Sequence, residues 1–199
     1  MIYPLSLIFG FFIGGLPFGL FLGRMKGIDV RKVGSGNIGA TNVYRVVGPI
    51  YGLITLVLDG LKGFIPVLIA PSLSLNSVLV GVGAVLGHIF SPYLKFKGGK
   101  GVTTTFGVLL ALAPLSFLIG VLFWFLIAFL SSYASVASLS IAVILPVLVL
   151  IAKSINLREG NLSNLIFVIA VGIAIWVMHR TNIKRLIRGE EPKLRWRRG

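Results

Sequence analysis

The feature that most constrains the fold is a series of long apolar stretches with very few charges inside them. Of the 199 residues, 56% are hydrophobic and 12% are charged, and the mean hydropathy is +0.99. A soluble domain carries about a quarter charged residues, and its apolar residues are not gathered into uninterrupted runs. Such stretches must lie in lipid. The sequence therefore predicts an all-α integral membrane protein.

Seven segments can be counted along the chain, and each is expected to form one transmembrane helix. The third and the fourth are shorter than the roughly 20 residues that a perpendicular span requires. A funnel or a locally thinned, polar region is expected there. Pro114 separates the fourth segment from the fifth. The seven segments are residues 2–23, 49–70, 77–90, 101–113, 115–130, 134–152 and 162–178.

The distribution of cations predicts the orientation of these helices. Sixteen of the nineteen Lys and Arg fall in residues 24–48, in residues 91–100 and in the tail from residue 179. Because cytoplasmic loops carry an excess of Lys and Arg, we expect an outside N-terminus and a cytoplasmic C-terminus. Residues 1–199 are expected to form a single polytopic membrane domain with a basic cytoplasmic tail over about 181–199. The end of that tail, with Trp196, is expected to lie against anionic headgroups.

The composition excludes several kinds of site. The chain has no cysteine, so disulfides and thiolate catalysis are excluded. Two histidines and five acidic residues are too few for a dedicated metal site, and no metal is expected. The first apolar stretch is not expected to be a cleaved signal peptide, because it is too long and no cationic segment precedes it.

Three polar segments emerge on the side predicted to be cytoplasmic. They are residues 33–45, 87–104 and 179–193, and each combines a cation with small or amide-bearing residues. Glycine lets backbone N–H groups approach an anion, Ser, Thr and Asn add donors, and Lys or Arg supplies charge. The combination predicts cradles for phosphate.

Two of these segments look like nucleotide-binding loops but lack the required context. Gly-Ser-Gly-Asn-Ile-Gly at residues 34–39 has the spacing of a dinucleotide loop, with Asp59 twenty positions further on. That loop follows a membrane helix instead of a strand, and Asp59 lies inside an apolar stretch. In the second segment Lys100 is followed by Gly101, where a Walker loop has Ser or Thr. Both nucleotide interpretations are rejected.

The charged and imidazole side chains in or beside the helices have alternative roles. Asp59 and Lys62 are three apart on one helix, and a charge inside a membrane helix is a functional candidate. We favour a structural ion pair that locks this helix against its neighbours. His88 and His179 lie at helix ends, where a structural role is at least as common as a catalytic one. His179 and Asn182 share a helical face, which favours a joint role at the membrane surface.

Taken in order, the motifs of the chain resemble one family of bacterial enzymes. They are Gly-Ser-Gly-Asn-Ile-Gly-Ala-Thr-Asn from residue 34, Asp-Gly-Leu-Lys-Gly from 59, Phe-Lys-Gly-Gly-Lys-Gly-Val-Thr-Thr from 96 and His-Arg-Thr-Asn-Ile-Lys-Arg-Leu from 179. This series is similar to that of the acyl-phosphate-dependent glycerol-3-phosphate acyltransferases, the PlsY type, from about Gly34 to Lys193. Ser91 is a departure, because relatives tend to have proline directly after the preceding phenylalanine. That departure affects no chemical role.

The resemblance implies a reaction and a location. A fatty acyl group passes from acyl phosphate to the 1-hydroxyl of glycerol 3-phosphate, giving lysophosphatidate and inorganic phosphate, as the first acylation in bacterial phospholipid synthesis. The protein would be multi-pass in the bacterial plasma (inner) membrane, with its active site facing the cytoplasm. No cofactor is implied, because the mixed anhydride is already activated. The implied partners are membrane lipids and an enzyme that forms acyl phosphate, with no nucleic acid.

For this reaction, three groups of residues are expected to surround the two phosphates. Arg45 would clamp a phosphate bidentately, and Lys100 would neutralise the leaving phosphate or the oxyanion. Ser35, His179 and Asn182 complete the expected catalytic set. Asp59, Lys62 and His88 are secondary candidates. The three groups are Ser35, Gly36, Asn37, Gly39, Ala40, Thr41, Asn42 and Arg45; Lys97, Gly98, Gly99, Lys100 and Gly101 with Thr103 and Thr104; and His179, Arg180, Asn182 and Lys184.

Two questions stay open at the level of sequence. The general base is His179, with His88 behind it, or else a substrate phosphate, whose second pKa is about 6. A transporter of anions or phospholipids is the rival class, although the polar segments gather on one face and no inverted repeat is evident. A receptor or scaffold would not need three glycine–cation loops. The preferred acyl chain and the oligomeric state are not indicated.

Overall fold

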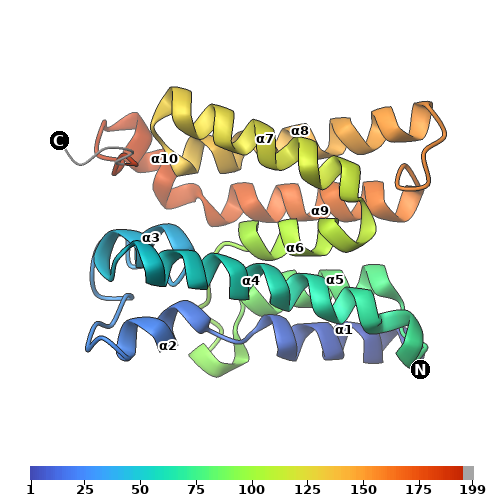
Figure 1. Ribbon diagram of the computed structural model, residues 1–199, viewed down its shortest axis with the longest axis horizontal. Coiled ribbons are helices and arrows are strands. Elements are labelled where there is room, and N and C mark those ends of the chain that lie inside the picture. Colours follow the sequence, from blue (N-terminus) through green and yellow to red (C-terminus); the bar gives the residue numbers. More distant parts are fainter. Residues whose placement is uncertain (195–199) are drawn as a thin grey trace. The chain divides into compact units, whose positions relative to one another are not determined.

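The computed structural model describes residues 1–194, and within that range the chain forms ten α-helices and two short 3-10 turns, with no strand (Figure 1). It divides into two compact units, Met1–Leu112 and Ala113–Gly199. The all-helical architecture predicted from the sequence is therefore confirmed over the described residues. Trp196 and the rest of the tail from residue 195 lie outside them.

The first unit contains α1 to α6. Its helices α1, α4 and α5 run lengthwise beside one another, and α2 and α3 lie at the end of the unit away from Met1 (Figure 1). The elements are α1 (Ile2–Gly14), α2 (Phe18–Arg24), α3 (Ala40–Val46), α4 (Pro49–Ile69), η1 (Ala70–Leu73), α5 (Ser77–Ile89), η2 (Pro92–Leu94) and α6 (Val102–Leu112).

Glycines allow the helices of this unit to touch backbone to backbone. A Cβ atom on Gly14 would collide with the backbone of Ala84, and one on Gly87 would collide with the carbonyl of Phe11, so α1 and α5 pack closely. A Cβ on Gly63 of α4 would likewise meet the carbonyl of Thr104 on α6. Small residues are what lets membrane helices approach in this way.

The first apolar stretch, predicted as one helix over residues 2–23, is broken in the structure. α1 ends at Gly14 and α2 begins at Phe18. Pro17 sits in the break and has no backbone N–H to donate, which explains the interruption. Two carbonyls near the break are satisfied from other elements. Ser91 Oγ donates to the carbonyl of Gly15 at 2.6 Å, and Lys62 Nζ donates to that of Leu16 at 2.7 Å. Ser91, the departure noted in the sequence, therefore has a packing role.

The second unit contains α7 (Pro114–Ser131), α8 (Ala134–Ser154), α9 (Leu162–Met178) and α10 (Arg180–Ile187). α8 packs against both α7 and α9. Glu159, in the loop between α8 and α9, accepts the backbone N–H of Leu115 at 3.0 Å and of Ser116 at 3.1 Å. A carboxylate at this position satisfies N–H groups of the first turn of α7 that have no partner in the helix.

Among residues 1–194, five helical segments are long and apolar enough to cross a membrane, and the bent pair of α9 and α10, at 53°, is a sixth candidate. α6 is apolar but only 11 residues long, in agreement with the short fourth segment expected from the sequence. The chain is thus multi-pass. Two helices were not predicted, namely α3 inside the first polar segment and α10 at the start of the basic tail.

Candidate functional site

The first polar segment is shaped by one buried amide, that of Asn42 on α3. Its Nδ2 donates to the carbonyls of Val30 at 2.9 Å, Val33 at 3.2 Å and Asn37 at 2.8 Å. Its Oδ1 accepts the backbone N–H of Ser35 at 2.8 Å. Only 2% of Asn42 is exposed. In this structure, Asn42 therefore holds the glycine loop from inside.

Two glycines of this loop occupy conformations that other residues rarely adopt. Gly34 has φ of 62° and Gly36 has φ of 71°. A Cβ on Gly34 would also collide with Oδ1 of Asn42. The glycines are therefore explained by the backbone path. Apart from buried Asn42, the expected residues of this group are exposed or half-buried, namely Ser35, Gly36, Asn37, Gly39, Ala40, Thr41 and Arg45.

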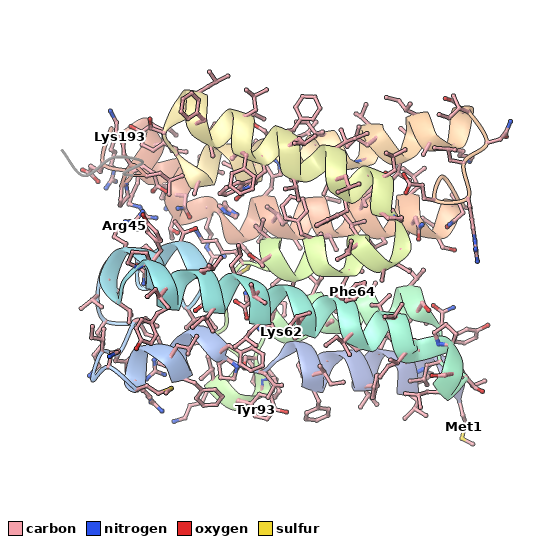
Figure 2. All side chains as sticks on the ribbon, in the orientation of Figure 1. Met1, Arg45, Lys62, Phe64, Tyr93 and Lys193 are labelled. Atoms are coloured by element: carbon pink, nitrogen blue, oxygen red, sulfur yellow. The ribbon has the colours of Figure 1, made fainter. Side chains whose placement is uncertain are left out.

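Arg45 lies in the last turn of α3 and is exposed (Figure 2). α3 itself is anchored by Val43, which is buried in a cluster with Leu20, Val30 and Ile38. The cluster fixes the helix that carries Arg45 against the loop it follows. An arginine held on an anchored turn is suited to a phosphate, because the guanidinium binds it bidentately.

Arg31, two residues before this segment, is engaged in an ion pair of its own. Arg31 Nη2 lies 2.7 Å from Asp29 Oδ2, and Arg31 Nε donates to Asp29 Oδ1 at 2.9 Å. These hydrogen bonds hold the pKa of the Asp29 carboxyl well below its usual range. The pair is at the surface, so its effect on stability is small.

The second polar segment folds back onto the end of α5. The backbone N–H of Gly98 donates to the carbonyl of Ile89 at 3.0 Å, and that of Gly99 donates to the carbonyl of His88 at 2.9 Å. Gly101 has φ of 82° and directly precedes α6. Lys100 is thus held between an anchored glycine pair and the start of a helix, and it is half-buried.

The remaining expected donors of this segment differ in exposure. Lys97 is exposed, Thr103 is half-buried and Thr104 is fully buried. Thr104 Oγ1 has no hydrogen-bond partner. Thr103 is therefore the more accessible of the two threonines.

Asp59, Lys62 and His88 gather in the interior of the first unit. Lys62 Nζ lies 2.7 Å from Asp59 Oδ1, and both side chains are almost fully buried. The ion pair expected from the sequence is confirmed. His88 Nδ1 lies 3.9 Å from the same Asp59 oxygen, which is too far for a hydrogen bond, so the imidazole packs beside the ion pair without bonding to it. Its sequence position did not indicate this placement.

The third polar segment belongs to the second unit. His179 lies between α9 and α10 and is 3% exposed. Its Nδ1 is 2.8 Å from the carbonyl of Ile175. A carbonyl oxygen only accepts, so Nδ1 carries the proton, and in the neutral ring Nε2 is the basic nitrogen. Arg180 and Lys184 are exposed on α10.

Glu191 organises this segment, although the sequence analysis assigned it no role. Its Oε1 accepts from Asn182 Nδ2 at 2.6 Å, and its Oε2 accepts from Arg185 Nε at 2.7 Å. Burial acts to raise the pKa of Glu191, but the hydrogen bonds from Asn182 and Arg185 outweigh it, so the pKa is lowered. The signal in the sequence was the pair of acids, Glu190 and Glu191, that follows a run of cations.

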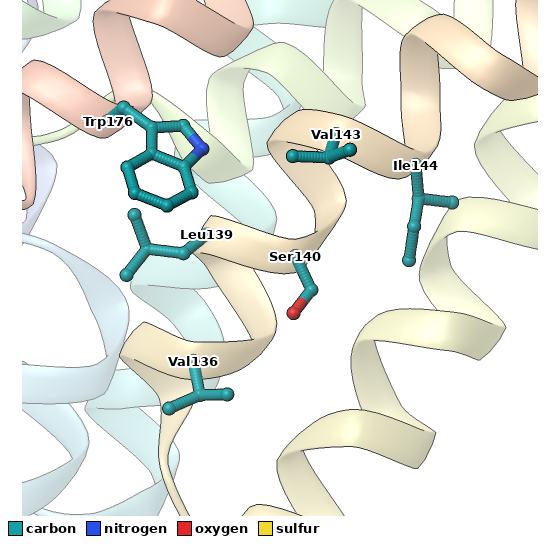
Figure 3. Close-up of a pocket in the computed structure, with 6 residues that line it drawn as sticks. All are labelled: Val136, Leu139, Ser140, Val143, Ile144 and Trp176. Atoms are coloured by element: carbon teal, nitrogen blue, oxygen red, sulfur yellow. The ribbon is translucent and has the colours of Figure 1, made fainter.

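An apolar groove runs along the second unit between α8 and α9 (Figure 3). Trp176 projects over it from α9, and the lining of α8 is aliphatic apart from Ser140. None of the expected site residues lines it. Its chemistry fits an alkyl chain. The lining residues are Val136, Leu139, Ser140, Val143, Ile144 and Trp176.

The expected site residues are thus divided between the two units. The groups around Arg45 and Lys100 belong to Met1–Leu112, whereas the group around His179 belongs to Ala113–Gly199. No cluster of three or more His, Cys, Asp or Glu that could hold a metal ion occurs among residues 1–194.

The sequence matches the model of the family described as Glycerol-3-phosphate acyltransferase over residues 4–189. It is similar to the glycerol-3-phosphate acyltransferase of Mesorhizobium japonicum, with 45% identity over 96% of this chain and 95% of the relative. It is also similar to that of Fusobacterium nucleatum, with 40% identity over 96% of this chain and 97% of the relative.

Two solved structures of PlsY (YgiH), an integral membrane glycerol 3-phosphate acyltransferase, have the same fold. The glycerol 3-phosphate form has a TM-score of 0.88 and 37% identity, covering 97% of this chain and 96% of that one. The lysphosphatidic acid form has a TM-score of 0.85 and 36% identity, covering 96% of this chain and 94% of that one. The chain therefore belongs to the glycerol-3-phosphate acyltransferase family and is an acyltransferase enzyme.

Proposed function

We propose that the chain transfers a fatty acyl group from acyl phosphate to the 1-hydroxyl of glycerol 3-phosphate, in the first acylation of phospholipid synthesis. The hydroxyl oxygen forms a bond to the acyl carbon, and the bond from that carbon to the phosphate oxygen breaks. The products are lysophosphatidate and inorganic phosphate, and the hydroxyl proton passes to a base. Membership of the family supports the acceptor.

The observation that carries this proposal is the pair of anchored glycine–cation loops in one unit. Asn42 fixes the first loop from inside, and the end of α5 fixes the second through the N–H groups of Gly98 and Gly99. Both proposed substrates carry a phosphate, so two cradles match two anions. We assign Arg45 to one phosphate and Lys100 to the phosphate that leaves or to the oxyanion.

Two groups are candidates for the base that takes the hydroxyl proton. His179 is a candidate because its Nδ1 proton is held by Ile175, which leaves Nε2 as the basic nitrogen. The alternative is a substrate phosphate, with a second pKa of about 6. If His179→Ala lowers turnover by less than about tenfold with substrate binding intact, the histidine is not the base, because general-base catalysis contributes about 10²–10⁴-fold.

We propose seven membrane crossings, with the N-terminus outside and the C-terminus in the cytoplasm of a bacterial cell. The sixteen cations of residues 24–48, 91–100 and the tail support this orientation in the inner membrane. The active site then faces the cytoplasm, where an enzyme that forms acyl phosphate supplies the donor. α6, with 11 residues, is the short fourth crossing in chain order.

The test is a comparison of donors with the purified chain in a defined micelle. Glycerol 3-phosphate is supplied with acyl phosphate or with acyl-CoA, and lysophosphatidate is measured by mass spectrometry. The proposal expects product from acyl phosphate alone. Equal or faster transfer from acyl-CoA would overturn the assigned donor while leaving the acyltransferase family unaffected.

A further inference from the structure

His88 stands between two features that the sequence places far apart. On one side its Nδ1 faces Asp59 Oδ1 at 3.9 Å, and this nitrogen has no hydrogen-bond partner. On the other side its Nε2 lies against the α-carbon of Gly99, where a Cβ would collide with it. Only 4% of His88 is exposed. The imidazole therefore fills the space between the buried ion pair and the glycine loop.

The backbone of His88 supports the same loop. Its carbonyl accepts the N–H of Gly99 at 2.9 Å, and a Cβ on Gly98 would collide with that carbonyl. The side chain and the backbone carbonyl of His88 thus fix the backbone positions of Gly98 and Gly99. Lys100 follows them directly, so its α-carbon position depends on His88.

The Lys62 ammonium in turn is held by three contacts. Lys62 Nζ donates to the carbonyl of Leu16 at 2.7 Å and lies 5.7 Å from the ring centroid of Phe18. Lys62 also pairs with Asp59 at 2.7 Å. The break between α1 and α2 therefore holds Lys62, Lys62 holds Asp59, and Asp59 faces the ring of His88.

We propose that Lys62, Asp59 and His88 form a buried positioning chain that sets the path of the loop 98–101 and so places Lys100 for catalysis. The chain is more than a lock between helices, because its last member touches the loop that carries a proposed catalytic cation. This inference rests on the proposed function for the role of Lys100. Displacing a catalytic group by about 1 Å can cost about 10²-fold in rate.

The contact between His88 and Gly99 allows a double-mutant test. Gly99→Ala adds a methyl group that meets the imidazole, and we expect kcat/KM to fall about 10²-fold as Lys100 moves. His88→Asn keeps a polar atom at the position of Nδ1 and removes the Nε2 side of the ring. We expect the penalty of Gly99→Ala to shrink about tenfold in that background, because residues in contact are not additive.

Two matched variants separate this contact from a general disturbance. His88→Gln keeps an atom at the position of Nε2, so Gly99→Ala should keep its full penalty in that background. Gly98→Ala is obstructed by the carbonyl of His88, which no side-chain change removes, so His88→Asn should not relieve it. Thr55→Val alters another buried polar residue of α4 that bonds only its own helix, to Tyr51, and should leave kcat/KM unchanged.

The readouts distinguish positioning from folding. Thermal unfolding in detergent gives the folded fraction, and kcat and KM are determined for that fraction. A purely structural role would lower the unfolding midpoint and leave both constants of the folded enzyme unchanged, which would overturn the proposal. Equal penalties for Gly99→Ala in the wild-type and His88→Asn backgrounds would also overturn it. If the wild-type chain shows no transfer, the proposed function fails, while the same cycle measured by unfolding still tests the contact.

Discussion

The side-chain oxygen of Asn42 lies 2.8 Å from the backbone nitrogen of Ser35, seven residues earlier in the chain. The same side chain donates to the carbonyls of Val30, Val33 and Asn37. One amide therefore satisfies four backbone groups of a loop that lies outside the helices. The loop proposed to receive phosphate is built around this residue.

We predict that Asn42→Asp destroys the loop, although it keeps the acceptor for Ser35. A carboxylate oxygen replaces Nδ2 and faces three carbonyls, and leaving such buried groups unsatisfied costs about 1–3 kcal/mol each. The unfolding midpoint should fall and transfer should be lost. The control is Asn76→Asp, since Asn76 caps α5 through its Oδ1 and Asp serves that role equally well. Similar stability of both variants would contradict the assignment.

Lys62 and Asp59 should depend on each other for stability. Lys62→Met or Asp59→Asn removes one partner and leaves the other charge buried without it. Each change should lower the free energy of unfolding by about 3–5 kcal/mol. Replacing both at once should be less harmful than the sum of the single changes. Thermal unfolding of the three variants checks this, and additive effects would show that the 2.7 Å contact has no energetic role.

Arg45 should be required for catalysis, and a lysine at this position should not restore full activity. We expect Arg45→Ala to lower kcat/KM about 10²–10³-fold, as for the loss of one preorganised donor. Arg45→Lys should recover only part, because an ammonium cannot bind phosphate bidentately. Arg31→Gln is the matched control, since Arg31 lies in the loop before α3 and is paired with Asp29. An equal loss in both variants would indicate a general charge effect.

Glu191 should make the stability of the second unit depend on acid pH. Its folded pKa lies below the ordinary 4.5, so its stabilising effect is present above that value and is lost as the pH falls through the folded pKa. Glu191→Gln should lower the unfolding midpoint at neutral pH by roughly several degrees and flatten its decline in acid. Glu190→Gln, at the exposed neighbour, should change neither.

The long apolar elements were predictable from the sequence. The segment expected over residues 162–178 is α9 (Leu162–Met178), and the one expected over 49–70 is α4 (Pro49–Ile69). Uninterrupted apolar length decides these helices locally. The break after α1 was missed because the apolar run continues through it, although Gly14, Gly15 and Pro17 were local indications.

The arrangement inside the polar segments could not be predicted in the same way. α3 is seven residues long, and its buried residues Asn42 and Val43 pack on the loop before it and on α2. His88 meets Gly99 only because the second loop folds back on α5. Such contacts depend on the tertiary path of the chain. The residue spacing in the sequence therefore indicated phosphate-binding chemistry in these segments, but it did not indicate which buried residues hold them in place.

In the proposed reaction acyl phosphate is the donor, and Lys100 neutralises the leaving phosphate or the oxyanion. The most direct measurement is the release of inorganic phosphate together with lysophosphatidate from acyl phosphate and glycerol 3-phosphate. We compare the wild-type chain, Lys100→Ala and Lys95→Asn, where Lys95 is an exposed cation of the same loop with φ of 51°. We predict equimolar products, a loss of about 10²–10³-fold for Lys100→Ala and near-normal rates for Lys95→Asn. Phosphate release without lysophosphatidate, or equal rates for both variants, would contradict the account.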